Sequence, residues 1–453
     1  MATATQVLLP TSMARKAGYL LALFYLFITY SRVIEVAVPS LRITALVYAT
    51  ALGLAVVSGG FMPALSHRIG RFLAAFAIWL VIATPFSIWK GGSVAALIEL
   101  LRNLPVYFIV AGLIWEFGEV RTAIHTLAYA ILTLAILALL LGGQMDGRLM
   151  LATGKFANPN DFAQALLIGM PFWWLMATRY GGGPIRRLAA FPAFAVIAYA
   201  MGLTGSRAAL LATAGAGLVF FLHVSFPNKL KLAAAAVAAF MLAIIVLPGS
   251  LRARYLTIFE PDESGYQSLE QDGPSLEKAL GSKEGRVALL RSSLQITFAN
   301  PLLGAGPGMF QVAEQKLAEA EGRSANWHET HNAFTQASSE AGLPALVFFT
   351  AVLVLSIRTS HRLHKRCSRD PALLPLAHTA LALETTLAAY TVTAFFSSVA
   401  YSNLLPTLAG LTVALERAVA AATASAEKAK TQEPVALPRR RRPSLRAQAM
   451  RLR

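Results

Sequence analysis

The run His328-Glu329-Thr330-His331-Asn332 places two histidines beside a carboxylate. A neutral imidazole can accept a proton from a hydroxyl near pH 7, so His331 is a candidate general base. A His-x-x-His spacing can also bind zinc, but no cluster of further ligands accompanies it in the sequence. The residues themselves are therefore compatible with acid–base chemistry or with a metal ion, and we expect no cofactor. The alternative is a pair of exposed histidines at a membrane surface.

A second candidate is the short turn Thr204-Gly205-Ser206-Arg207 between two apolar stretches. It places Arg207 where the second stretch begins, at the expected N-terminus of a helix. Helix N-termini and guanidinium groups both favour anions, above all phosphate. We favour an anion site that includes Ser206 and Arg207 over an arginine that only extends along apolar surface to reach water.

Two further arginines, Arg286 and Arg291, precede the glycine-rich run 300–308. On a regular helix they would lie about 140° apart and would not share a face. They can hold one diphosphate only if their side chains converge or if the helix begins after Arg286. The alternative is a solvated helix in which Glu284 pairs with an arginine.

The run Asn158-Pro159-Asn160-Asp161 stands just before another apolar stretch. Asn160 or Asp161 is expected to cap the helix that follows, because their side chains accept hydrogen bonds from its free N–H groups. Contact with a substrate is the other interpretation, and the two roles are compatible.

The composition indicates which kind of secondary structure must position these residues. Of 453 residues, 56% are hydrophobic and only 14% are charged, whereas soluble domains carry about 25% charged residues. A helix needs about 20 mainly apolar residues to span a bilayer. We predict an all-α polytopic membrane protein with about 12 transmembrane helices and one long, partly helical loop. The predicted spans are 17–36, 41–59, 72–89, 94–115, 121–142, 162–178, 187–203, 207–224, 230–248, 333–357, 374–396 and 399–419.

The distribution of basic residues predicts the orientation of these spans in the membrane. Alternate connections are rich in Lys and Arg, and the positive-inside rule places them, together with both termini, in the cytoplasm. The basic connections contain Arg68, Arg71, Arg121, Arg179, Arg186, Arg187, Lys229, Lys231, Arg358, Arg362, Lys365, Arg366 and Arg369. Charge placement of this kind also accounts for the net charge of +17, so we predict contact with membrane lipid and no binding of nucleic acid.

The chain divides into four parts on this basis. Residues 1–248 contain spans one to nine, and 249–332 form the long loop on the outer side, with helical runs at 286–299 and 309–321. Residues 333–419 contain the last three spans, and 420–453 form a basic tail that we predict to be disordered and cytoplasmic. The single cysteine, Cys367, excludes an internal disulfide and is expected in a cytoplasmic loop.

Most of the polar motifs fall at the outer ends of the spans. Only Glu99 and Arg102 are expected deep in the bundle, as a buried pair three residues apart. Transporters instead concentrate ionisable residues near the middle of the membrane. The distribution therefore favours an enzyme at the interface over a transporter or flippase.

The ordered motifs resemble the O-antigen ligase and polymerase superfamily of bacterial membrane glycosyltransferases. The features that carry the resemblance are Asn158-Pro159-Asn160, the turn ending at Arg207, Arg286 followed by 301–308, and His331-Asn332 with Glu340 and Gly342 beyond. Their order and the long loop before the histidine match the family pattern over roughly residues 150–345, and the span layout extends the match to most of the chain.

The resemblance implies a metal-independent, inverting transfer of a glycan from undecaprenyl diphosphate to an acceptor hydroxyl at the periplasmic face of the bacterial inner membrane. Arg207 and Arg286 would neutralise the leaving diphosphate, His331 would orient or deprotonate the hydroxyl, and Asn332 and Glu340 would position it. The remaining residues expected to contact substrate are Arg291, Asn158, Asn160, Asp161, Ser206, His328 and Glu329.

Three acceptors compete within the family. Lipid A core would make the protein an O-antigen ligase, and another lipid-linked repeat would make it an O-antigen or exopolysaccharide polymerase. A protein hydroxyl would make it an O-oligosaccharyltransferase, which ranks third because such members tend to be longer. We favour the ligase, in lipopolysaccharide biosynthesis.

Overall fold

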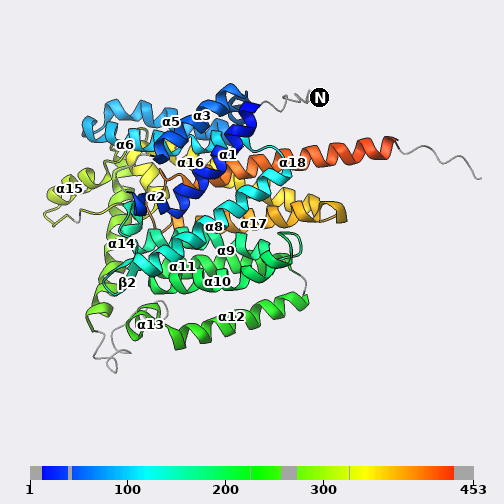
Figure 1. Cartoon of the computed structure of the whole chain (residues 1–453). Helices are drawn as coiled ribbons and strands as arrows, with labels where there is room; N and C mark the ends of the chain where they lie inside the picture. Colours follow the sequence, from blue (N-terminus) through cyan, green and yellow to red (C-terminus); the bar gives the residue numbers. More distant parts are fainter. Residues whose placement is uncertain (1–12, 39–42, 225, 257–272, 326, 433–453) are drawn as a thin grey trace, which may run out of the picture.

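The computed structural model describes residues 13–38, 43–224, 226–256, 273–325 and 327–432, which are almost entirely helical (Figure 1). The first half contains α1 (Met13–Ser31), α2 (Val33–Ala37), α3 (Ile43–Val57), α4 (Phe61–Ser66), α5 (Arg68–Ala83), α6 (Lys90–Asn103), α7 (Val106–Leu113), α8 (Phe117–Leu141), α9 (Pro159–Ala177) and α10 (Pro184–Leu203). The second half contains α11 (Arg207–His223), α12 (Phe226–Val246), α13 (Gly249–Leu256), α14 (Gly273–Ala299), α15 (Phe310–Ala320), α16 (Ala333–Cys367), α17 (Leu374–Ala394) and α18 (Leu404–Gln432).

The apolar stretches of the sequence form these helices because a helix satisfies its backbone hydrogen bonds internally. Each of the twelve predicted spans overlaps a helix, and the span at 94–115 is divided between α6 and α7 at Leu104 and Pro105. Within the described residues, seven helical segments are long and apolar enough to cross a membrane, and α3 and α11 are shorter apolar helices. The all-α fold is therefore confirmed, while the number of crossings stays a prediction.

Helices α9 and α17 lie at the centre of the bundle, and most of their residues are buried. Buried polar side chains link these two helices to each other and to a neighbour. Gln164 of α9 donates to the Thr393 hydroxyl of α17 over 2.6 Å, and Trp173 of α9 donates to the Ala128 carbonyl of α8 over 2.9 Å. Because α11 and α16 both pack on α17, this centre fixes the two helices that carry the site.

A small β-hairpin, which the sequence analysis did not predict, follows α8. Strands β1 (Gly143–Met145) and β2 (Arg148–Met150) pair antiparallel. Asp146 and Gly147 connect them with φ of 53° and 71°, the left-handed conformations that a two-residue hairpin turn requires. The hairpin brings Arg148 to the end of the bundle at which α10 and α11 meet.

The long loop contains more helix than predicted. Helix α14 begins at Gly273 rather than at 286 and lies across one end of the bundle, against α13, α15 and α16 (Figure 1). The predicted run at 309–321 corresponds to α15. Residues 257–272 of the predicted loop lie outside the described residues.

Three smaller predictions need correction. Helix α18 continues to Gln432, so residues 420–432 are helical rather than disordered, and 433–453 lie outside the described residues. Glu99 and Arg102 are exposed on α6 rather than buried in the bundle. Cys367 ends α16 and is fully buried, because its side chain is turned into the bundle.

Candidate functional site

The turn before α11 presents Arg207 as predicted from its sequence. The Ser206 hydroxyl accepts a hydrogen bond from the Ala209 N–H over 3.4 Å and so caps α11. Gly205 has a φ of 60°, which a residue with a Cβ adopts only at a cost. The cap and the glycine together fix Arg207 as the first residue of α11.

Two other arginines brace this turn from separate elements. Nε of Arg148, from β2, donates to the Thr204 carbonyl over 2.6 Å. Nε of Arg254, from α13, donates to the Gly205 carbonyl over 3.0 Å. Only Nε of each arginine is used in these bonds. The remaining N–H groups and the positive charge of each guanidinium lie near Arg207.

The motif before α9 meets the same arginine group. Nη2 of Arg148 donates to the Asn160 Oδ1 over 2.8 Å. The N-cap of α9 is Asn158, whose Oδ1 accepts from the Asn160 N–H over 2.9 Å. The prediction that Asn160 or Asp161 caps this helix was therefore wrong, because the helix begins at Pro159 and its cap must precede it.

Four arginines, namely Arg148, Arg207, Arg254 and Arg286, form an electrostatically coupled cluster. Burial, and then repulsion by Arg254, Arg286 and Arg207, lowers the pKa of Arg148 to about 9. Burial and Arg254 also lower the pKa of Arg286, which Asp161 partly offsets. All four remain charged at neutral pH, so this arginine cluster favours a multiply charged anion.

His331 lies within electrostatic reach of the arginine cluster. Burial lowers its pKa to about 4, and the positive charge of Arg286 and then His328 add to the effect. The imidazole is therefore neutral at physiological pH and able to accept a proton. The charge of Arg286 affects the pKa of both His331 and Arg148, and the charge of Arg207 also affects Arg148. The arginines and the histidine are therefore on one side of the bundle.

The backbone at His331 is unusual. Its φ is 50°, in the left-handed region that residues with a Cβ rarely occupy. The Ser398 hydroxyl accepts the His331 N–H over 2.9 Å and lies 3.2 Å from the Thr330 hydroxyl. Asn332 caps α16 by accepting the N–H groups of Phe334 and Thr335. The histidine is thus held between a helix cap and the loop after α17.

Glu340 is directed away from solvent. It is 4% exposed, and its Oε2 accepts the Gly308 N–H over 2.7 Å. Immediately beyond it, α16 is interrupted at Ala341 and Gly342, where φ is −138° and 79°. These contacts give Glu340 a role in positioning the glycine-rich turn against α16.

The glycine-rich turn uses its own amides in folding. The N–H groups of Ala305 and Gly306 donate to the carbonyls of Ser339 and Glu340, each over 2.8 Å. The Gly304 N–H bonds within the turn, to Asn300, over 2.9 Å. With these amides occupied, the turn supports the break in α16 and does not form a phosphate-binding loop.

The remaining predicted site residues are exposed, either beside His331 or away from the arginine cluster. His328 and Glu329 are exposed, and the His328 ring lies 6.1 Å from that of His331. Arg291 is exposed on α14 and acts on Glu321 rather than on the arginine cluster, as the helical spacing from Arg286 predicts.

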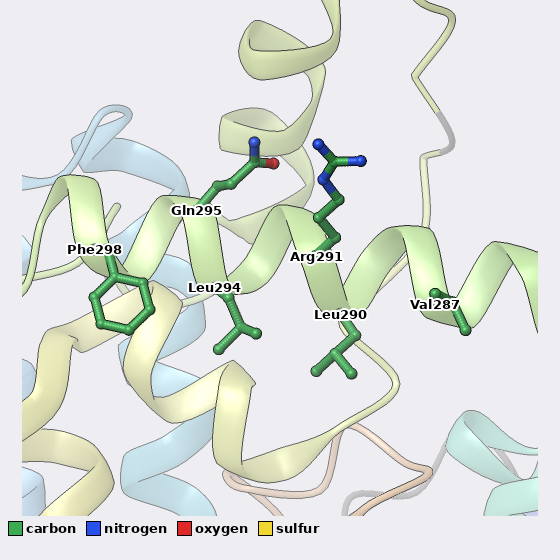
Figure 2. A pocket seen from close by; sticks show the side chains of 6 residues that line it. All are labelled: Val287, Leu290, Arg291, Leu294, Gln295 and Phe298. Carbon is green, nitrogen blue, oxygen red and sulfur yellow. The ribbon is translucent and has the colours of Figure 1, made fainter.

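Arg291 borders a shallow groove of about 570 Å³ along α14. The groove is lined mainly by Val287, Leu290, Leu294 and Phe298, and Figure 2 shows Arg291 and Gln295 projecting from the opposite side of the helix to Leu290 and Leu294. An apolar stripe on α14 therefore begins one residue after Arg286.

The sequence analysis missed Arg148, Arg254 and Ser398. Arg148 follows the dipeptide Asp146-Gly147, a signal for a hairpin turn that would have marked a fixed position for the arginine. No local pattern marks Arg254 or Ser398, because both reach the site only through long-range packing.

Residues 192–350 match the protein family described as O-Antigen ligase. This region contains Arg207, Arg254, Arg286, His331 and Glu340, whereas Arg148 and Ser398 lie outside it. The chain matches no curated protein.

Proposed function

We propose that this multi-pass membrane protein is an inverting, metal-independent glycosyltransferase, because residues 192–350 match the family described as O-Antigen ligase. It moves a glycan from undecaprenyl diphosphate to an acceptor hydroxyl at the periplasmic face of the bacterial inner membrane. Members of this family are membrane enzymes that transfer polyprenyl-linked glycans. The observation that carries the proposal is the arginine cluster beside a neutral, half-buried histidine.

The donor diphosphate binds to Arg207 and Arg286, with Arg148 and Arg254 adding charge. When the anomeric C–O bond breaks, the electron pair leaves with the diphosphate and its negative charge increases. Guanidinium groups that are already in place stabilise that charge without reorganisation. The hydrogen bonds of Arg148 and Arg254 to the turn before α11 provide such placement.

His331 is the proposed general base. The acceptor oxygen attacks the anomeric carbon from the side opposite the diphosphate, while its proton passes to the imidazole. Burial and Arg286 keep that imidazole neutral, so it is ready to accept the proton. A positioned base contributes typically about 10²–10⁴-fold to a rate.

The other predicted residues divide by their contacts. Ser206, Asn158 and Asn332 cap helices and therefore position the groups beside them. Asn160 and Asp161 interact with Arg148 and Arg286 respectively, and we assign them to orientation of the arginine cluster.

Glu340 supports the turn behind the site and is a positioning residue. The exposed His328, Glu329 and Arg291 are available to the glycan or the acceptor.

The apolar groove on α14 offers a course for the polyprenyl chain. It begins beside Arg286, which we assign to the diphosphate, and its apolar side chains are exposed. The polyprenyl tail of the donor lies along this stripe, while the diphosphate stays at the arginine cluster and the sugar projects into water.

The decisive experiment is glycan transfer by the purified protein from a lipid-linked donor to a lipid acceptor. Arg207→Ala should lower the rate about 10²–10³-fold through loss of charge stabilisation, and His331→Ala about 10²–10⁴-fold. Arg369→Ala, an exposed arginine beyond the other end of α16, is the matched control and should retain the wild-type rate. Full activity of both site variants, with unchanged elution in detergent, would refute the assignment.

Lipid A core is the acceptor that we favour, with a second lipid-linked repeat as the main alternative. A deletion strain separates the two on a lipopolysaccharide gel. Loss of a ligase leaves core without O-chains, whereas loss of a polymerase leaves core with single repeats. A protein acceptor would show as loss of protein glycosylation, and a flippase would show no transfer by the purified protein.

A further inference from the structure

A second group of ionisable side chains lies at the far end of the bundle. It contains His223 at the end of α11, His361 on α16 and Glu384 on α17, and their ligand atoms lie within 4.8 Å of one another. Nδ1 of His361 is 3.0 Å, and Nε2 of His223 is 4.0 Å, from the same oxygen of Glu384. Tetrahedral ligands about 2.0 Å from a zinc ion would be about 3.3 Å apart, so the observed spacing is close to that of a metal site.

The backbone fixes the proton on His223. Its Nδ1 lies 2.8 Å from the Val219 carbonyl, which can only accept, so Nδ1 carries the hydrogen and Nε2 of the neutral ring keeps its lone pair. His364 is held the same way, with Nδ1 3.0 Å from the Ala377 carbonyl, and its ring lies 4.9 Å from the ring of His223. A second-shell carbonyl of this kind orients histidines that bind metals.

Glu384 is poorly satisfied without a cation. Its side chain is only 9% exposed, and among the described residues its Oε2 has no hydrogen-bond partner. A protonated His361 would pair with Oε1 alone. It would leave Oε2 and the His223 lone pair unused, although a buried carboxylate is costly unless it is well paired.

We propose that His223, His361 and Glu384 bind one Zn²⁺ ion, with water or His364 as the fourth ligand. Two imidazoles and a carboxylate form a ligand set that zinc accepts, and the side chain of His361 is 48% exposed, which leaves a path for entry. The site is structural. Arg207 and His223 are at opposite ends of α11, about 24 Å apart at 1.5 Å per residue, so the ion takes no part in the proposed transfer.

The zinc joins three helices that also build the glycosyltransferase site. Arg207 begins α11, His331 lies two residues before α16, and Ser398 follows α17. The ion would link the C-terminal end of α11 and the C-terminal part of α16 to the middle of α17, the helix on which both of them pack.

The test is metal content of the full chain, purified in detergent through a tag without histidine. After incubation with Zn²⁺ and dialysis, we expect about one zinc ion per wild-type chain, and in its place Co²⁺ should give the visible absorption of a tetrahedral site. The double variant His223→Ala/His361→Ala and the variant Glu384→Gln should lose both signals. His67→Ala is the matched control and should bind zinc normally. His67 pairs with Glu416 over 3.0 Å, and among the described residues no third ligand accompanies them.

A chelator should lower the unfolding temperature of the wild-type chain and not that of the double variant, as expected for a ligand bound to the folded state. A wild-type chain without zinc or a cobalt spectrum, or a double variant with undiminished zinc, overturns the proposal. Arg207→Ala should lose transfer and keep zinc, which distinguishes failure of this site from failure of the proposed function.

Discussion

His331 combines a strained backbone with a neutral, half-buried side chain. Its φ of 50° is uncommon for a histidine, and the Ser398 hydroxyl that accepts its N–H holds it there. Conformations of this type persist where surrounding structure fixes them, and they concentrate at functional sites. The positive φ and the low pKa of the imidazole therefore both support the proposed role of this residue as the general base.

The pH dependence of transfer follows from the His331 pKa. The folded chain holds it at about 4, below the ordinary value of 6.5, so the imidazole remains an acceptor for protons well into the acid range. We expect the acid limb of kcat/KM, which reports the free enzyme, to have a midpoint clearly below 6. An acid limb at 6.5 or above would contradict this environment for His331.

Two further consequences have the same origin. The bound diphosphate adds negative charge, so the acid limb of kcat should lie at higher pH than that of kcat/KM. Protonation of His331 favours the unfolded chain, in which the histidine has its ordinary pKa of 6.5. The contribution of His331 to stability therefore decreases as the pH falls from 6.5 towards 4.

At the scale of elements, the break in α16 depends on a close approach that only glycine permits. Gly342 has a φ of 79°, and a Cβ there would overlap the Leu302 carbonyl of the glycine-rich turn. Leu343 completes the contact by donating its N–H to the Pro301 carbonyl over 2.7 Å. The turn, the break and Glu340 thus form one structural unit.

We predict that Gly342→Ala lowers stability by about 1–3 kcal/mol, through positive φ and overlap with the turn. The measurement is the unfolding temperature in detergent. Gly217→Ala is the matched control, because Gly217 lies within α11 with no atom within 4 Å of an added Cβ; this change should be neutral or stabilising by up to about 1 kcal/mol. Equal unfolding temperatures for the two variants would exclude the proposed role of the break.

The elements that the sequence predicted well are those decided by local composition. Apolar stretches such as 121–142 and 207–224 became α8 and α11 with ends shifted by a few residues. The hairpin at 143–150 escaped notice because its strands are too short for a periodic pattern, and only Asp146-Gly147 marks it. The first part of α14 escaped because a polar, glycine-containing run resembles a loop when its packing against α13 is unknown.

The site was predictable to a similar degree. Arg207, Arg286 and His331 stand in distinctive local patterns, and the structure places them on one side of the bundle. Arg148 and Arg254 complete the cluster through bonds to a turn far from them in sequence, which no local pattern reveals. Glu340 was identified from its motif, but its contact with Gly308 required the folded chain.

At the scale of the whole molecule, the two groups of ionisable residues lie at opposite ends of the same helices. Helix α11 runs from Arg207 to His223, and α16 runs from beside His331 past His361. A membrane around the apolar length between them would place one group on each side. The orientation of the bundle therefore decides which group meets the donor lipid.

We predict that α15 faces the periplasm and the connection between α9 and α10 faces the cytoplasm, because Arg179, Arg186 and Arg187 follow the positive-inside rule. Lys316→Cys on α15 and Gly183→Cys in that connection both introduce thiols at exposed positions. The wild-type chain is the blank, since Cys367 is its single cysteine and is fully buried. A maleimide that cannot cross membranes should label Lys316→Cys in spheroplasts and Gly183→Cys only after lysis. The reverse pattern would put the arginine cluster in the cytoplasm, out of reach of a periplasmic acceptor, and the transferase proposal would fail with it.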